Sequence, residues 1–242
     1  MEQKGEAAVA TAKAMLMVAP ALQKKPQPAR PAAVHEEVYQ RLRRAIISGQ
    51  LEPGRSLSVR GLAAEFGVSA MPAREAIRQL AAQGALEFTP TRRVAVARMS
   101  KHKLDELSEA RLALEPALAV RALRIKGAAR ERLASEMERI DATLDEAIKR
   151  GDSADYARYN SEFHFTLYEA AASPVYLGLV ESLWLQTGPF MRVVIGRVGT
   201  SSLIDQHQEA LRALRAGDAK KLEAAIRDDI AEGMSNIARA EI

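Results

Sequence analysis

Four polar side chains interrupt apolar stripes in the second half of the chain, and their types are those that hold metal ions. Asn160 and His164 lie four residues apart beside an aromatic stripe, so both lie on the same side of one expected helix. His207 and Asp229 interrupt the apolar faces of two later helices. An amide oxygen, two imidazole nitrogens and a carboxylate oxygen would suit zinc, nickel, manganese or iron, and the sequence does not choose among these ions.

A network of ordinary buried hydrogen bonds would account for the same residues without a metal. A charge inside a helical bundle is costly unless it is paired, and a His207–Asp229 pair would meet that need. Spacing alone leaves both interpretations open.

Arg111 occupies a position in the apolar stripe of the first helix of this half. It either pairs with Glu115 one turn later or faces a cavity, where its planar guanidinium would hold the carboxylate of a small effector. We favour the second interpretation, with Arg192 as a further candidate for contact with the effector. Tyr156 and Trp184 are expected in the core rather than against a ligand.

The elements that must position these residues are helical by their apolar spacing. The pattern predicts a mainly α chain whose region 103–239 is an all-α antiparallel helical bundle. The expected helices are 103–126, 128–150, 153–172, 175–198 (with a break near Gly188–Pro189), 202–216 and 218–239. None of them is apolar for long enough to cross a membrane.

The region 34–99 has a different organisation, with three expected helices followed by a hairpin. The helices are 34–48, 59–66 and 70–83, and Gly67 lies in the tight turn between the second and third. Short strand-like runs at 86–89 and 94–97 flank a basic tip. This order of elements is that of a winged helix–turn–helix, whose second paired helix enters the major groove of DNA.

The distribution of charge supports DNA as the partner of this region. Residues 34–100 carry ten Lys or Arg against six Asp or Glu, whereas residues 101–242 carry twenty against twenty-three. The candidate DNA contacts are Ser69 as the N-cap of the third helix, Arg74 one turn later, and Arg92 and Arg93 at the hairpin tip. The alternative is that these arginines are solvated surface charges.

Residues 1–33 are expected to form a mostly disordered extension. Lys13 interrupts their apolar stretch, and prolines around Lys25 prevent regular structure. The chain has no cysteine, which excludes disulfides and thiolate metal sites and suits a reducing cytoplasm.

The stretch Leu57–Leu80 (LSVRGLAAEFGVSAMPAREAIRQL) closely resembles the GntR family of bacterial regulators, as does Ala45–Gly54 (AIISGQLEPG) before it. The resemblance implies that Arg60, Arg74 and the segment Ser69–Met71 contact DNA. Two departures stand out: Ala70 and Arg93 occupy positions where the family usually has an arginine and a wing glycine, respectively.

The remainder of the chain is similar to the sensor of the FadR-type branch, an FCD domain. In its metal-binding members the ligands are an acidic residue and three histidines, and this chain matches at His164 and His207. Asn160 stands where aspartate is usual, and Asp229 stands where the last histidine is usual. The resemblance also implies that Arg111 lies near the effector pocket.

These observations together predict a cytoplasmic homodimer that binds a double-stranded DNA operator and responds to a small carboxylate, with help from a divalent metal. Three other functions remain as alternatives: a regulator that responds to the metal itself, a metal-dependent hydrolase, and an architectural DNA-binding protein without a ligand. We expect a regulator rather than an enzyme, because no general base stands out beside the metal ligands and a hydrolase leaves the basic region unexplained.

Overall fold

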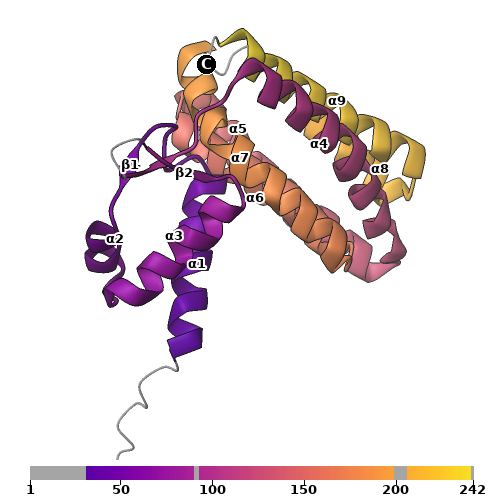
Figure 1. Ribbon diagram of the computed structural model, residues 1–242. Coiled ribbons are helices and arrows are strands. Elements are labelled where there is room, and N and C mark those ends of the chain that lie inside the picture. Colours follow the sequence, from indigo (N-terminus) through magenta and orange to yellow (C-terminus); the bar gives the residue numbers. More distant parts are fainter. Residues whose placement is uncertain (1–30, 90–92, 199–205, 241–242) are drawn as a thin grey trace, which may run out of the picture. The chain divides into compact units, whose positions relative to one another are not determined.

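The computed structural model describes residues 31–89, 93–198 and 206–240 (Figure 1). The expected fold class is confirmed, because a winged helix–turn–helix with a small sheet precedes a set of long helices. Residues 1–30 of the expected extension, and the wing residue Arg92, lie outside the described residues.

Three helices form the body of the winged domain: α1 (Pro31–Ile47), α2 (Val59–Phe66) and α3 (Ala70–Ala82). Residues 31–33 belong to α1, because proline is well suited to the first position of a helix. Gly67 ends α2 with a φ of 66°, a left-handed conformation that glycine adopts without steric cost, and the chain then turns into α3. The buried faces of these helices form one core with Leu42, Ile46, Leu62, Ala73, Ile77 and Leu80.

Three short antiparallel strands complete this domain in the order β1-β3-β2. They are β1 (Ser56–Leu57), β2 (Leu86–Phe88) and β3 (Val94–Val96). The sequence pattern does not predict β1, because two residues are too few to show alternation. The strand is defined by its pairing with Ala95 and Val94 of β3.

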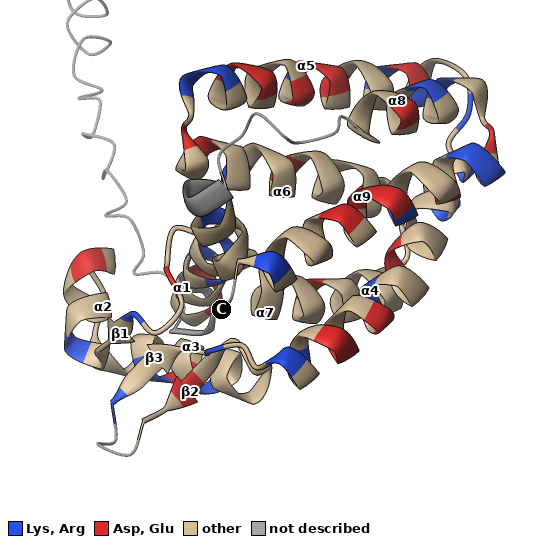
Figure 2. Cartoon of the chain, turned by 90° about the horizontal axis from the view of Figure 1, so that it is seen from above, with Lys and Arg blue, Asp and Glu red and all other residues tan. Residues whose placement is uncertain are grey.

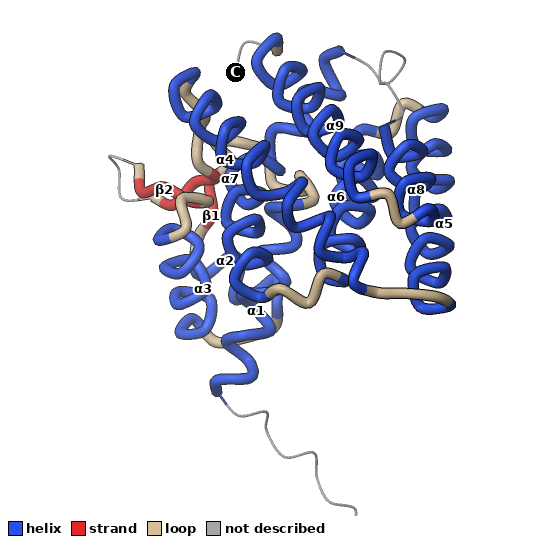
Figure 3. The backbone as a smooth tube through the Cα atoms, turned by 90° about the vertical axis from the view of Figure 1, so that its right-hand side faces the viewer, coloured by secondary structure: helices blue, strands red, loops and turns tan. Residues whose placement is uncertain are grey.

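The second domain, residues 101–240, is called the sensor domain after the FadR-type domain that it resembles, and the elements that define its described part are helices (Figure 3). Its elements are α4 (Lys101–Arg121), a 3-10 turn (Ala122–Arg124), α5 (Ala128–Arg150), α6 (Ser153–Ala170), α7 (Pro174–Val198), α8 (Gln206–Ala216) and α9 (Ala219–Arg239). Side chains of Ser100, Asp152 and Asp218 cap the first turns of α4, α6 and α9.

The sensor helices pack pairwise around an aromatic core. α4 and α8 both lie against α9, and α6 lies between α5 and α7. Trp184, Tyr168, Phe163 and Phe190 are its largest fully buried side chains. Charges of both signs follow the length of α5, as Figure 2 shows, so its outer face is polar while its inner face packs on α6. No helix in the described ranges is long and apolar enough to span a membrane.

The end of α1 lies directly against the middle of α7. A Cβ atom at Gly188 would lie only 2.3 Å from the carbonyl oxygen of Ile47, so only glycine permits this approach. Arg43 of α1 also forms an ion pair with Glu181 of α7. The expected break near Gly188–Pro189 is wrong: α7 is continuous through both residues, and the glycine serves close packing instead.

Candidate functional site

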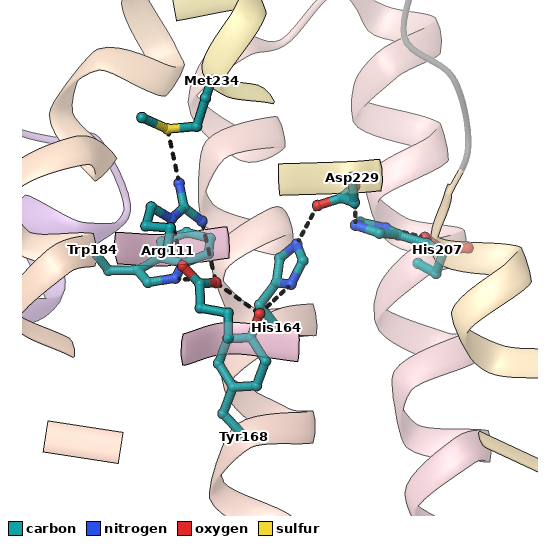
Figure 4. A network of polar contacts seen from close by, with 9 residues as sticks. Arg111, His164, Tyr168, Trp184, His207, Asp229 and Met234 are labelled. Atoms are coloured by element: carbon teal, nitrogen blue, oxygen red, sulfur yellow. Dashed lines mark hydrogen bonds and ion pairs between the residues drawn. The ribbon is translucent and has the colours of Figure 1, made fainter. Parts of the chain in front are cut away.

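His164, His207 and Asp229 meet inside the sensor domain although they come from three helices, α6, α8 and α9 (Figure 4). His164 Nε2 lies 3.0 Å from Asp229 Oδ2, and His207 Nε2 lies 3.7 Å from Asp229 Oδ1. One ligand atom from each residue lies within 4.8 Å of the other two. Two donors bound to the same ion at about 2.1 Å are themselves separated by roughly 3 to 3.5 Å, so this spacing suits a shared cation.

The other ring nitrogen of each histidine has a polar partner. His207 Nδ1 lies 2.7 Å from Asp141 Oδ1, and Asp141 Oδ2 accepts a hydrogen bond of 2.6 Å from Gln208. His164 Nδ1 lies 3.2 Å from the Tyr168 hydroxyl, which donates its own proton to Glu115 at 2.7 Å. Partners of this kind fix the tautomer and orientation of metal-binding histidines.

This network assigns the protons on both imidazoles. Because the Tyr168 hydroxyl donates to Glu115, its oxygen accepts from Nδ1–H of His164, and the Asp141 carboxylate likewise accepts from Nδ1–H of His207. In a neutral imidazole the Nε2 lone pair then faces the acceptor-only carboxylate of Asp229. Because the imidazole lone pairs and the carboxylate oxygens are all acceptors, a proton or a metal cation must lie between them. The donor set therefore fits a divalent ion.

Asp229 is held in its charged form. Burial raises the pKa of its carboxyl, but His164, His207 and Arg111 together outweigh burial and lower the pKa to about 2. The carboxylate is therefore present as a ligand over the whole physiological pH range.

Asn160 is buried and lines the same small cavity as His164 and Asp229. The cavity has a volume of about 40 Å³. That is room for about three water molecules, since each needs roughly 10–15 Å³ of space measured in this way. The other residues around it are Arg111, Tyr156, Trp184, Met191, Val194, Ile230, Glu232, Gly233 and Asn236.

Arg111 pairs with Glu115 and also lines this cavity, so the structure combines features of both interpretations of its role. Its Nε lies 2.5 Å from Glu115 Oε1 and its Nη2 lies 3.3 Å from Oε2. Its Nη1 points to the sulfur of Met234 at 3.5 Å, which is a weak acceptor. The guanidinium stacks 4.5 Å above the Trp184 ring, whose nitrogen donates to Glu115 at 2.9 Å.

Arg111 and Tyr168, which both contact Glu115, have shifted pKa values. Burial lowers the pKa of Arg111, but Glu115 more than compensates, and the pKa lies above its usual value. Burial and the Glu115 charge raise the pKa of Tyr168 well above its usual value. Arg111 therefore stays cationic and Tyr168 stays a neutral hydrogen-bond donor.

Arg192 is not among the residues around the cavity. Its neighbour Met191 lines the cavity, and one residue further along a helix turns the side chain by about 100°. Arg192 instead packs on the winged domain. A Cβ atom added at Gly49 would lie 3.0 Å from the Cβ atom of Arg192.

The expected DNA contacts that the structure describes lie on the surface of the winged domain. Arg60 on α2, and Ser69, Met71 and Arg74 at the start of α3, are exposed, as is Arg93 beside the wing tip. Ser69 occupies the N-cap position, but its hydroxyl makes no capping hydrogen bond, so that detail of the prediction is wrong.

Sequence reasoning missed Asp141, Tyr168 and the role of Trp184. Asp141 is buried in the stripe formed by Ala134, Met137 and Leu144, so a charged residue on an apolar face was the available signal. Tyr168 lies one turn beyond His164 on α6. The spacing gave no indication that Trp184 would reach Glu115 on another helix.

Two family models match this chain. The model described as "Bacterial regulatory proteins, gntR family" matches residues 34–96, and that of the FCD domain matches residues 106–232. The chain belongs to the gntR family. It is a DNA-binding transcription regulator of the GntR type with an FCD domain, in agreement with the resemblance seen in the sequence.

Characterised regulators are similar over most of the chain. The regulator McbR of Escherichia coli is 29% identical over 185 residues, which is 75% of this chain and 82% of McbR. The gluconate operon repressor of Bacillus subtilis is 26% identical over 77% of this chain and 78% of its own length. The solved structure of E. coli McbR/YncC has a TM-score of 0.77 at 23% identity, with 86% of this chain and 99% of that chain covered, and shows the same fold.

Proposed function

We propose that this gntR-family protein is a homodimeric repressor or activator whose operator affinity changes when a small carboxylate binds beside a divalent ion in the sensor domain. Asn160, His164, His207 and Asp229 would hold the ion. The observation that carries the proposal is the convergence of two imidazole Nε2 atoms on the Asp229 carboxylate, with each Nδ1 held by a polar partner.

The ion would attract the carboxylate of the effector and orient it in the cavity. Among the protein's own groups, Arg111 is best placed to assist. Glu115 already occupies its Nε and Nη2, so recognition would fall to Nη1, whose one acceptor among the described residues is the Met234 thioether. An effector oxygen is a stronger acceptor than a thioether sulfur and would replace it.

The cavity has room for only about three water molecules, so an organic acid larger than that would have to enlarge it. Binding would therefore favour a conformation with more space between α4, α7 and α9, which supply Arg111, Met191 and Met234. A ligand shifts an equilibrium only through its different affinity for two states, and this requirement for opening supplies such a difference.

Helix α7 connects this cavity to the winged domain. Trp184, Met191 and Val194 line the cavity, while Gly188 on the same helix lies against Ile47 of α1. A displacement of α7 would move α1, on which α3 packs. In a dimer this movement would change the separation of two recognition helices, and with it the fit to half-sites one helical turn apart.

The test is the operator affinity of the full chain for a duplex selected from a random library, measured by fluorescence anisotropy. It is measured with chelator, with each divalent metal alone, and with metal plus a panel of small carboxylic acids. We expect one acid to change the dissociation constant about 5- to 150-fold, and only in the presence of metal.

Asp229→Ala should lose this response, whereas Asp228→Ala, which changes the exposed neighbour on the same helix, should keep it. A response to acids that persists in Asp229→Ala would refute the role of the ion. A selected duplex whose affinity no acid changes with any metal would refute the carboxylate effector.

A second candidate function is a regulator for which the ion itself is the signal. The cavity of about 40 Å³ favours it, since a bare ion and one water molecule fit without any opening. Chelation alone would then change operator affinity at least fivefold, and no acid would add to the change.

A further inference from the structure

The outward face of α3 changes character along its length. Ala70 and Met71 in the first turn are exposed and apolar, whereas Arg74 and Arg78, further along the same face, are exposed and basic. The opposite face, with Ala73, Ala76, Ile77 and Leu80, is buried in the winged domain. The face available to DNA therefore begins with an apolar tip.

Met71 is exposed to an unusual degree for a large apolar side chain. Its side chain is 73% exposed, and among the described residues only Phe88, Val175 and Leu179 are also large, apolar and exposed. Ala70 beside it has no polar group either, and the Ser69 hydroxyl makes no capping bond. The tip thus presents methyl and thioether groups, which cannot hydrogen-bond strongly to a base edge.

The two arginines on this face are not equivalent. Arg78 is bound by Glu75 one turn earlier, which reduces what it can offer to DNA. In the described part of the chain Arg74 has no ion-pair partner, so its guanidinium can bind a phosphate or the edge of a guanine. Polar recognition by α3 is therefore centred on Arg74, one turn after the apolar tip.

We propose that Met71, with Ala70, makes this regulator select thymine by contact with its 5-methyl group in the major groove. The 5-methyl group is the one apolar feature that a base pair presents in the major groove, and apolar side chains recognise it. The operator half-site then has a thymine facing the start of α3, next to the position that Arg74 contacts. This inference rests on DNA binding by the winged domain.

The experiment removes the methyl group without touching any hydrogen-bonding group. A duplex is selected from a random library with the full-length protein, and each thymine of one half-site is replaced in turn by deoxyuridine. At one or two positions we expect the affinity of the unmodified protein to fall about fourfold per methyl group. For Met71→Ala, replacing thymine by deoxyuridine at those positions should lower the affinity less than about twofold, because this variant has already lost the contact with the methyl group. Met71→Leu should behave like the unmodified protein.

The controls separate this inference from DNA binding in general. Affinity for an unrelated duplex at low salt should be the same for Met71→Ala and the unmodified protein, because phosphate contacts supply non-specific binding. Uracil substitutions that leave affinity unchanged everywhere, or that weaken Met71→Ala as much as the unmodified protein, would overturn the assignment while DNA binding stands. Failure to select any duplex would overturn both.

Discussion

Substitution of Gly188 by alanine tests the contact through which the sensor domain would act on the winged domain. A glycine-to-alanine change inside a helix normally stabilises a protein by about 1 kcal/mol, because alanine has the higher helix propensity. At Gly188 the added Cβ would lie 2.3 Å from the Ile47 oxygen and 2.9 Å from the Ile47 Cα. Overpacking of this kind costs about 1–3 kcal/mol.

Gly178 on the same helix provides the matched control, because a Cβ there would meet nothing within 4 Å. Urea unfolding should show Gly178→Ala to be more stable than the unmodified protein, and Gly188→Ala to be about 1–3 kcal/mol less stable than Gly178→Ala. We also expect Gly188→Ala to bind metal normally while its operator affinity responds less to the effector. Equal stability of the two variants would show that α1 and α7 do not approach as described, and the argument for coupling through α7 would fail.

Three further predictions concern the buried charges and a helix cap. Glu115→Gln should lower the free energy of unfolding by about 3–5 kcal/mol, because it leaves Arg111 buried without a counter-charge. Glu136→Gln, which changes an exposed ion pair, should leave the free energy of unfolding nearly unchanged. In metal-free protein, Asp229 should contribute about 2 kcal/mol of stability above pH 4 that is lost as the pH falls toward 2, because its folded pKa of about 2 lies below the usual 3.8. Asp229→Asn should lack this acid-dependent loss in urea titrations at several pH values, and a loss of equal size in the variant would contradict the assignment. Asp152→Ala should lower the urea concentration at the unfolding midpoint, since Asp152 accepts hydrogen bonds of 3.0 Å from two amides at the start of α6. An unchanged midpoint would mean that solvent replaces the cap.

Much of the fold follows from local patterns in the sequence. Apolar spacing of three and four residues predicts the sensor helices, and Gly67 marks the turn between α2 and α3 because a left-handed residue must end α2 there. The i and i+4 spacing of Asn160 and His164 places them on one side of α6, and both are buried beside the same cavity.

Long-range partners lie beyond what periodicity can predict. Asp141 and His207 are far apart in sequence, and their contact depends on how α5 packs against α8. The continuity of α7 through Gly188 and Pro189 is also a tertiary effect, since a proline and a glycine locally favour a break while packing against α1 and the core holds the helix together. The tight fit of Gly188 has no periodic signature at all.

Native mass spectrometry of the full-length protein tests the central claim most directly. We predict a dimer with one divalent ion per subunit, an ion that Asp229→Ala loses and the neighbouring variant Asp228→Ala retains. A dimer that carries no metal after incubation with zinc, nickel, manganese and iron would contradict the metal site. It would mean that the His164–Asp229–His207 cluster is held together by protons alone.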